Sequence, residues 1–82
     1  MQNRSEEQLT KSLSELLSKK RESANLSETD LAKIAKLSPH RVKALEEGKE
    51  RFGLEVLSKL ATAFNTTVFE LITEAEDLRL SR

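Results

Sequence analysis

The sequence predicts an all-α domain built from five helices, and three observations lead to that prediction. Apolar residues recur at helical spacing in five separate stretches of the chain. In three of these stretches a Ser or Thr stands three residues before an acidic residue or Gln, which is typical of a helix N-terminus. Gly occurs twice and Pro once in 82 residues, too few for the many turns of an all-β fold. A chain of this length is expected to form one small domain.

The first helix is expected to begin at Ser5, which forms a capping box with Gln8, and to end near Ala24 or Asn25. Basic residues in its last turns suit the negative end of the helix dipole. One stripe at helical spacing contains Leu9, Leu13, Leu16 and Leu17. We expect this stripe to face the core.

The second helix is expected to follow the N-cap Ser27, with Asp30 at its third position. It must stop by Lys36, because a second cap follows almost at once. The core face of this helix is expected to contain Leu31, Ala32 and Ala35.

The third helix is expected to follow the cap Ser38 and to span Pro39–Glu47. Proline is favoured at a first helical position, because the N–H that it lacks would have no partner there. Gly48 is expected to end the helix in the left-handed conformation. Helical rotation places Val42 and Leu45 on the inner face.

The fourth helix is expected from about Leu54 to Phe64, with Asn65 as its left-handed terminator. A capping box of Thr67 with Glu70 then predicts a fifth helix, which begins at Val68 and ends near Leu78. The inward residues of the fourth helix are expected to be Leu57, Leu60, Ala61 and Phe64.

Two short helices joined by about four residues, each opened by a Ser cap, form a helix-turn-helix pattern. The stretch LSETDLAKIAKLSPHRVKALEEGK, residues 26–49, resembles the phage-repressor/Cro family, also called Xre-type. The stretch LEVLSKLATAFNTTVFEL, residues 54–71, resembles that family's fourth helix and the start of its fifth. The resemblance implies a five-helix, phage-repressor-like DNA-binding bundle. The pair formed by its second and third helices would be the helix-turn-helix.

The resemblance covers residues 13–71 and suggests how the chain is organised. Residues 1–12 are expected to be an N-terminal extension of the first helix. Residues 13–72 are expected to be the helix-turn-helix domain, and residues 73–82 a C-terminal extension of the fifth helix. The family also implies an ion pair between Arg21 and Glu46, which would tie the third helix to the bundle. The alternative is two unrelated solvated charges.

The sequence departs from the family pattern at three positions. Glu28 stands where the family usually has Gln, and its charge would face a DNA phosphate unfavourably. Lys36 stands where the family usually has Gly, so we expect a lysine at positive φ. Phe52 occupies a loop position where the family favours Pro.

The third helix can present several side chains to base edges in a major groove. His40 can donate to a base or a phosphate, although an exposed surface histidine is an equal alternative. Arg41 can pair with guanine or reach a phosphate from the flank of the helix, and Ala44 can pack on a thymine methyl. The expected base contacts are His40, Arg41, Lys43 and Ala44. The expected backbone contacts are Ser27, Thr29, Lys36, Lys49 and Arg51.

The chain carries 14 basic and 14 acidic side chains, so its formal net charge is zero. This sum argues against nucleic-acid binding, which usually accompanies a basic surplus. The distribution of charge along the chain is more favourable to nucleic-acid binding. Residues 25–51 hold six basic and five acidic groups, whereas residues 52–82 hold three basic and five acidic groups. A basic face with an acidic back fits this distribution.

An enzyme is not expected, because the chain has one His, no Cys, no phosphate-binding Gly loop and no metal-spaced cluster. We therefore predict no catalytic residue, no metal and no cofactor. No apolar run approaches the roughly 18 residues of a membrane span, so we expect no membrane contact. Without a signal sequence, the prediction is a cytoplasmic protein.

The fifth helix carries two apolar stripes, one formed by Val68, Leu71, Ala75 and Leu78 and the other by Phe69 and Ile72. One stripe is sufficient to close the core. We predict that Phe69 and Ile72 form a homodimer interface, although a single wide core face is the alternative. The expected function is thus a sequence-specific transcription regulator, a dimeric repressor that docks its third helix in the major groove. The alternative is a protein–protein interaction module, or an antitoxin-like regulator, with a weakened DNA face and a protein partner.

Overall fold

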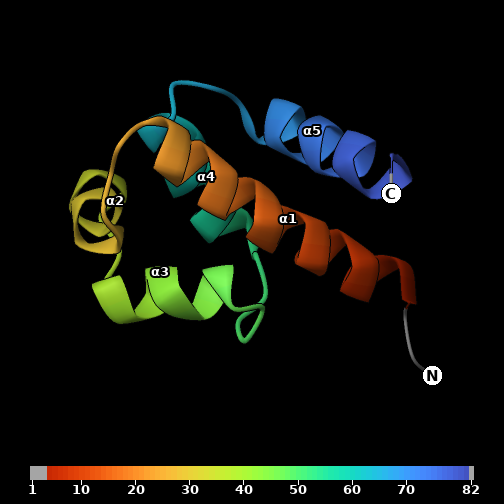
Figure 1. The fold of residues 1–82 in the computed structure, drawn as a ribbon, viewed down its shortest axis with the longest axis horizontal. Helices are drawn as coiled ribbons and strands as arrows, with labels where there is room; N and C mark the ends of the chain where they lie inside the picture. The colour runs from red at the N-terminus through yellow and green to blue at the C-terminus, as the bar shows by residue number, and fades with distance from the viewer. Residues whose placement is uncertain (1–3, 82) are drawn as a thin grey trace.

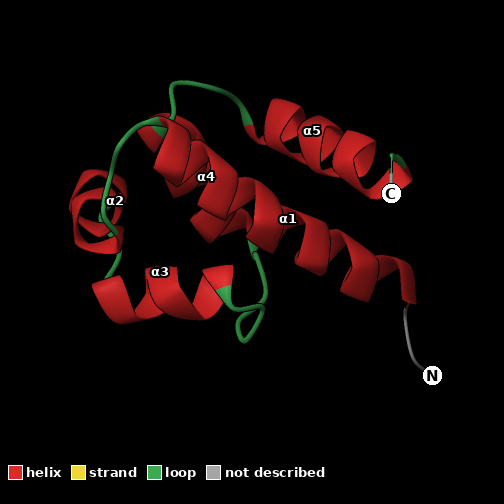
Figure 2. Cartoon of the chain, in the orientation of Figure 1, coloured by secondary structure: helices red, strands yellow, loops and turns green. Residues whose placement is uncertain are grey.

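The computed structural model describes residues 4–81, with side chains from residue 6, and this part of the chain forms five helices. These helices are α1 (Arg4–Ser23), α2 (Glu28–Ala35), α3 (Pro39–Glu46), α4 (Leu54–Ala63) and α5 (Val68–Leu80), labelled in Figure 1. The segments between them are loops and turns, and no strand occurs within residues 4–81 (Figure 2). The predicted all-α architecture of five helices is confirmed.

The first helix organises the bundle. α1 and α5 lie side by side and run in opposite directions, and α3 packs on the other side of α1 (Figure 1). α2 packs against both α3 and α4, and α4 also contacts α5. Both α1 and α5 continue as single helices across the predicted boundaries at residues 12 and 72. The division into a domain and two extensions stays a prediction.

The hydrophobic core draws side chains from all five helices. Leu31, Val42 and Leu45 have no exposed surface, so the helix pair α2–α3 is held at its inner faces. Leu13 and Leu17 of α1 are buried as predicted. Other members of the cluster are Ala32, Ala35, Leu37, Val56, Leu57, Leu60, Ala61, Leu71 and Ala75. Because a domain of this size buries only about 60% of its unfolded surface, each of these contacts matters for stability.

The observed N-caps agree only partly with prediction. Asp30 N–H donates to the Ser27 hydroxyl over 3.0 Å and Ser27 N–H donates to the Asp30 carboxylate over 3.1 Å, so this capping box is confirmed. At α5 the Thr67 hydroxyl accepts from Glu70 N–H over 3.0 Å. The prediction for Ser5 is wrong, because α1 already includes Arg4 and so Ser5 lies within the helix.

Asp30 makes stability depend on pH. The backbone N–H of Ser27, together with its hydroxyl, lowers the pKa of the Asp30 carboxyl. A carboxylate with a lowered folded-state pKa stabilises the protein above its unfolded pKa, about 3.9, and this contribution is lost as pH falls through the folded value. We expect Asp30→Asn to be less stable than the wild type at neutral pH and the gap to close in strong acid. Urea unfolding of both proteins at neutral pH and in strong acid measures this difference in the free energy of unfolding. A difference that does not change with pH would contradict the role assigned to Asp30.

Four loop residues adopt the left-handed backbone conformation. Asn25, Lys36, Asn65 and Gly48 have φ of 57°, 58°, 54° and 74°. Gly has no Cβ to clash in this conformation, and Asn tolerates it better than most residues. The predictions for Lys36, Gly48 and Asn65 are confirmed. Lys36, the C-cap of α2, is the one of the four that carries a long aliphatic side chain in this conformation.

Lys36→Gly is expected to raise the free energy of unfolding by about 1 kcal/mol, because Gly removes the strain of a left-handed C-cap. Lys33→Gly, on the exposed face of the same helix, is the matched control. It should lower stability by about the same amount, since Gly inside a helix is unfavourable. Urea unfolding followed by circular dichroism measures both. A loss of stability in Lys36→Gly would mean that the lysine side chain stabilises the turn.

Candidate nucleic-acid interface

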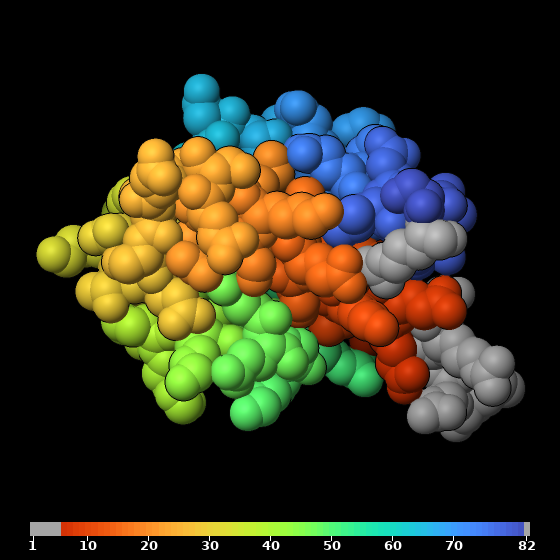
Figure 3. Space-filling model, viewed as in Figure 1, coloured from red at the N-terminus to blue at the C-terminus, as the bar shows by residue number. Residues whose placement is uncertain are grey.

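The segment α2–turn–α3 forms a continuous surface on one side of the molecule (Figure 3). The turn contains Lys36, Leu37 and Ser38, and buried Leu37 anchors it to the core. The Ser38 hydroxyl accepts from Arg41 N–H over 3.1 Å and caps α3, which begins with Pro39. The sequence thus folds this segment into two helices in fixed relation, with the second helix exposed along its outer face.

The outer face of α3 borders a hollow of about 520 Å³. Val42 and Leu45 point into the core, which leaves the opposite side chains outward. The residues that line the hollow are His40, Lys43, Ala44, Glu47, Lys49 and Glu50. Three of the four predicted base-contacting residues therefore gather here, together with one predicted backbone contact. Arg41 is not among the lining residues and lies on the flank of α3.

Arg41 is held by an acidic side chain that the sequence reasoning missed. Its Nε and Nη2 both donate to Oε2 of Glu50, over 3.0 Å and 2.7 Å. These hydrogen bonds, and the nearby charges of Glu50 and Glu55, raise the pKa of the Arg41 guanidinium. Glu50 lies beyond the end of α3 in an irregular loop, so no helical or strand period could have predicted this contact.

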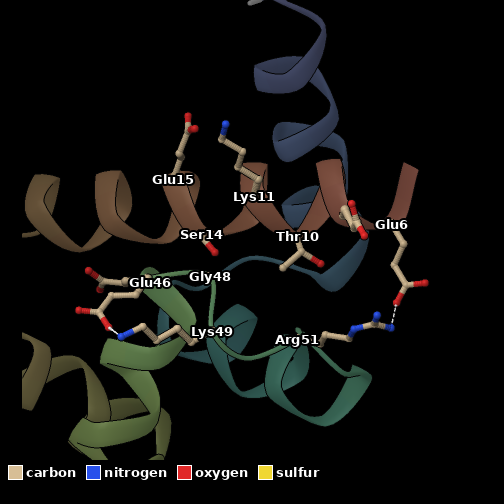
Figure 4. Close-up of a pocket in the computed structure, with 11 residues that line it drawn as sticks. Glu6, Thr10, Lys11, Ser14, Glu15, Glu46, Gly48, Lys49 and Arg51 are labelled. Carbon is tan, nitrogen blue, oxygen red and sulfur yellow. Dashed lines mark hydrogen bonds and ion pairs between the residues drawn. The ribbon is translucent and has the colours of Figure 1, made fainter. Parts of the chain in front are cut away.

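Two of the predicted backbone contacts are also paired within the protein. Lys49 Nζ lies 3.1 Å from a carboxylate oxygen of Glu47, and both side chains are largely exposed. Arg51 forms an ion pair with Glu6 on α1 (Figure 4). Surface pairs of this kind contribute little to stability, and salt or a phosphate can displace them. Both cations are therefore open to exchange for a phosphate partner.

The remaining predicted contacts lie exposed around the same segment. Lys36 and Lys43 are exposed, and within residues 6–81 neither takes part in an ion pair. Ser27 and Thr29 are exposed at the N-terminus of α2. Glu28, between them, is partly buried, and its charge helps to raise the pKa of Arg21. Glu28 therefore has a cation nearby within the protein itself.

The C-terminal end of α3 is fixed by a charged hydrogen-bond network. Arg21 Nε and Nη2 donate to the two carboxylate oxygens of Glu46 over 2.6 Å and 3.1 Å, and Ser18 Oγ donates to Glu46 over 2.9 Å. Arg21 Nη1 also donates to the carbonyl of Leu26 over 2.9 Å. The side chains of Arg21 and Glu46 are only 16% and 7% exposed, and the hydrogen bond to Glu46 raises the pKa of Arg21. The structure thus contains the expected pair, and it joins α1, α3 and the α1–α2 turn.

Sequence reasoning missed two serines that belong to this support. Ser14 Oγ donates to the backbone carbonyl of Leu45 over 2.6 Å, in a buried position. Ser14, Ser18 and Arg21 follow one another at i, i+4 and i+7, so they lie on one face of α1. Ser14 bonds to Leu45, and Ser18 and Arg21 bond to Glu46. Their spacing was the available signal, because two serines stand in line with Arg21 on the face of α1 beside the apolar stripe.

A second cleft, of about 640 Å³, separates the first half of α1 from the connection between α3 and α4 (Figure 4). Ser14 and Thr10 extend from α1 toward this connection, whereas Lys11 and Glu15 point away from it. Five acidic residues line the cleft, namely Glu6, Glu7, Glu15, Glu46 and Glu47. The three basic ones are Lys11, Lys49 and Arg51. This excess of acidic side chains does not suit a polyanion, so the hollow beside α3 is the better candidate for a DNA-binding surface.

The outer face of α5 lies on the far side of α1 from α3 (Figure 1). Phe69 is 77% exposed, whereas Ile72 is partly buried and packs against the core. The two residues predicted as a dimer interface are thus in different environments. Leu71 and Ala75 are buried and close the core, as one of the two predicted stripes requires.

No group of three His, Cys, Asp or Glu side chains in the described residues is arranged to hold a metal ion. None of the helices formed by residues 4–81 has the length and apolar character needed to cross a membrane.

Comparison with known proteins gave a family match and two similar structures. A family model described as helix-turn-helix matches residues 17–71, which include all of α2, α3 and α4. A crystal structure of the clp gene regulator ClgR from Corynebacterium glutamicum superposes with a TM-score of 0.80 at 23% identity, over 89% of this chain and 78% of that one. A second ClgR structure from that organism gives 0.74 at 25% identity, over 84% and 90%. No curated protein matches the chain.

Proposed function

Because the chain belongs to the helix-turn-helix family of the phage-repressor/Cro (Xre) type, we propose that it is a transcription regulator that binds double-stranded DNA. The single observation that carries this proposal is the outer face of α3. It is exposed, it borders a hollow lined by His40, Lys43 and Ala44, and its far end is fixed by the Arg21–Glu46 pair. A rigid, exposed helix of this kind fits the major groove.

In this proposal α3 reads base edges while the neighbouring segments hold the phosphates. Lys43 and His40 donate to base acceptors, Ala44 packs on a thymine methyl, and Arg41 reaches the groove from the flank. The phosphates are bound by side chains on both sides of α3, namely Ser27, Thr29, Lys36, Lys49 and Arg51. Both similar structures are those of a clp gene regulator, which supports a regulatory role for this chain.

We also propose that the protein forms a homodimer and acts as a repressor. Phe69 is a large apolar side chain exposed on α5, away from α3, so two copies can join there with both α3 helices free. To bind two half-sites, a two-fold dimer must place its α3 helices in successive major grooves, about 34 Å apart. The proposed repression would act by exclusion, because a dimer bound to its operator keeps other proteins from that site. Acting on DNA, the protein is assigned to the cytoplasm.

We expect the wild type to sediment as a dimer at tens of micromolar protein and Phe69→Glu to sediment as a monomer, because a buried unpaired carboxylate at the interface is unfavourable. Leu54→Glu is the matched control, since Leu54 is also a large apolar residue and is 72% exposed, but on α4. It should remain a dimer. A wild type that is monomeric at these concentrations would contradict the dimer.

The test of the proposed function is binding to random-sequence duplex DNA, measured by fluorescence anisotropy over a salt series. On random-sequence DNA no base is read, so all five cations of the proposed face would contact phosphates, namely Lys36, Arg41, Lys43, Lys49 and Arg51. Five such contacts would give a slope of log affinity against log salt of about −4.5, at roughly 0.9 per phosphate. Absence of binding at low salt would overturn the proposal.

The second candidate is a protein–protein interaction module, or an antitoxin-like regulator. Its support is that Arg41, Lys49 and Arg51 are already paired with glutamates, which weakens the positive field of the face. Ile34 on α2 is also 52% exposed and borders a groove between α2 and α4 that a protein partner would cover. If the protein is an interaction module alone, the salt series would show no DNA binding, and the protein would serve as bait for a partner. An antitoxin-like regulator would bind both DNA and a protein partner.

A further inference from the structure

The contact between Arg41 and Glu50 has a particular geometry. Both hydrogen bonds from the guanidinium end on the same oxygen, Oε2 of Glu50. The donors that they use are Nε–H and one N–H of Nη2. An arginine has five N–H donors in a planar fork, so three remain. Two of these are on Nη1 and one is on Nη2.

The remaining donors include a complete bidentate pair. One N–H of Nη1 and the second N–H of Nη2 point in parallel from the end of the guanidinium, along the edge next to the Nε–Nη2 edge that Glu50 occupies. That pair matches two acceptor atoms held side by side, such as O6 and N7 of guanine or two oxygens of a phosphate. Glu50 therefore leaves the recognition edge of Arg41 available while it occupies the other edge.

We propose that Glu50 is a positioning residue that holds Arg41 with its free N–H pair ready for a bidentate acceptor on DNA, and this inference rests on the proposed function. Arg41 is 40% exposed and Glu50 is 29% exposed, so the pair is accessible from solvent and partly ordered by the surface around it. An arginine that is already held in one rotamer loses less conformational entropy when it binds. Glu50 also lines the hollow beside α3, which places the pair at its rim.

The opposite role for Glu50 would be to mask Arg41. In that case its negative charge competes with DNA for the guanidinium and repels phosphates as well. The two roles predict opposite signs for the same substitution. The variant Glu50→Gln separates the two roles further, because the glutamine amide oxygen accepts the same two hydrogen bonds but carries no charge.

The experiment compares Glu50→Ala and Glu50→Gln with the wild type on the best duplex obtained by selection from a random pool. We expect Glu50→Ala to weaken binding about tenfold, as expected for a poorly oriented bidentate contact. Glu50→Gln should bind within about threefold of the wild type, since the hydrogen bonds are kept. In an Arg41→Ala background Glu50→Ala should instead tighten binding, because only the repulsive charge is then removed.

Glu47→Ala is the matched control, because Glu47 lines the same hollow and carries the same charge but is paired with Lys49. It should tighten binding slightly in the presence of Arg41. Tighter binding by Glu50→Ala and Glu50→Gln alike would overturn the inference and leave the proposed function intact. Absence of DNA binding by the wild type would overturn both.

The same variants identify the acceptor. If it is guanine, the loss in Glu50→Ala is confined to duplexes that carry a guanine at one position, and selection with Glu50→Ala no longer enriches that base. If it is a phosphate, the loss is the same on every sequence and the salt slope falls by about 1. Either pattern supports the positioning role of Glu50.

Discussion

Replacing both Arg41 and Lys43 with glutamate is expected to weaken binding to DNA by at least about 100-fold, at roughly tenfold or more for each contact. Lys43 is exposed on the outer face of α3, and Arg41 lies at its flank. The substitutions remove two attractive contacts and place two carboxylates against the DNA. Fluorescence anisotropy on selected duplexes measures this loss of affinity. On random-sequence duplexes, where both side chains would contact phosphates, the slope of log affinity against log salt should also become shallower by about 2.

The control must carry the same change in net charge at a distance from α3. Lys11→Glu with Lys19→Glu meets this requirement, because both lysines are exposed on α1. This variant should lose much less affinity, because neither lysine belongs to the proposed DNA face and salt screens exposed charges that do not contact the DNA. Equal losses in the two variants would mean that net charge governs binding and that α3 does not read the groove. Under the protein-partner alternative, the substitutions on α3 would leave partner binding intact.

Glu46→Ala is expected to lower the free energy of unfolding by about 2 kcal/mol and the Tm by about 10 °C. Glu46 is 7% exposed and accepts hydrogen bonds from Arg21 and Ser18. Its removal leaves a mostly buried guanidinium that faces an apolar methyl group instead of a carboxylate. A thermal unfolding curve followed by circular dichroism at 222 nm measures the shift.

Glu74→Ala is the matched control, because it also removes a glutamate from an ion pair on a helix. Glu74 pairs with Lys20 over 3.2 Å, but its side chain is 44% exposed. An exposed pair contributes about 0–1 kcal/mol, so the Tm should change little. Similar Tm shifts in Glu46→Ala and Glu74→Ala would mean that burial of the Arg21–Glu46 pair does not determine how much the pair stabilises the protein. Glu46→Gln should give an intermediate result, since it keeps an acceptor and loses the charge.

Local sequence rules predicted the ends of α2 and α3 closely. The cap at Ser27 and the turn at Lys36 depend on residues a few positions apart, and so does the stop at Gly48. Short-range rules describe such features well. The prediction at Ser5 was wrong because a capping sequence permits a helix start without requiring one, and α1 extends past it.

The contacts of the candidate site were harder to predict from sequence. The partner of Arg41 is nine residues away across an irregular loop, and that of Ser14 is thirty-one residues away. Such pairs depend on how the helices pack, which no local pattern encodes. The Arg21–Glu46 pair was expected only because the family resemblance implied it. On α5, periodicity grouped Phe69 with Ile72. In the structure Ile72 packs against the core, whereas Phe69 is exposed.

The support of α3 is concentrated at one end. Ser14, Ser18 and Arg21 each bond to residue 45 or 46. The outward side chains of His40, Lys43 and Ala44 take no part in that network. Exchanging the three outward residues therefore leaves the anchoring bonds unchanged. Libraries at these positions should yield proteins of nearly constant stability and varied operator preference, because the residues that could set the preference are physically separate from those that hold the helix.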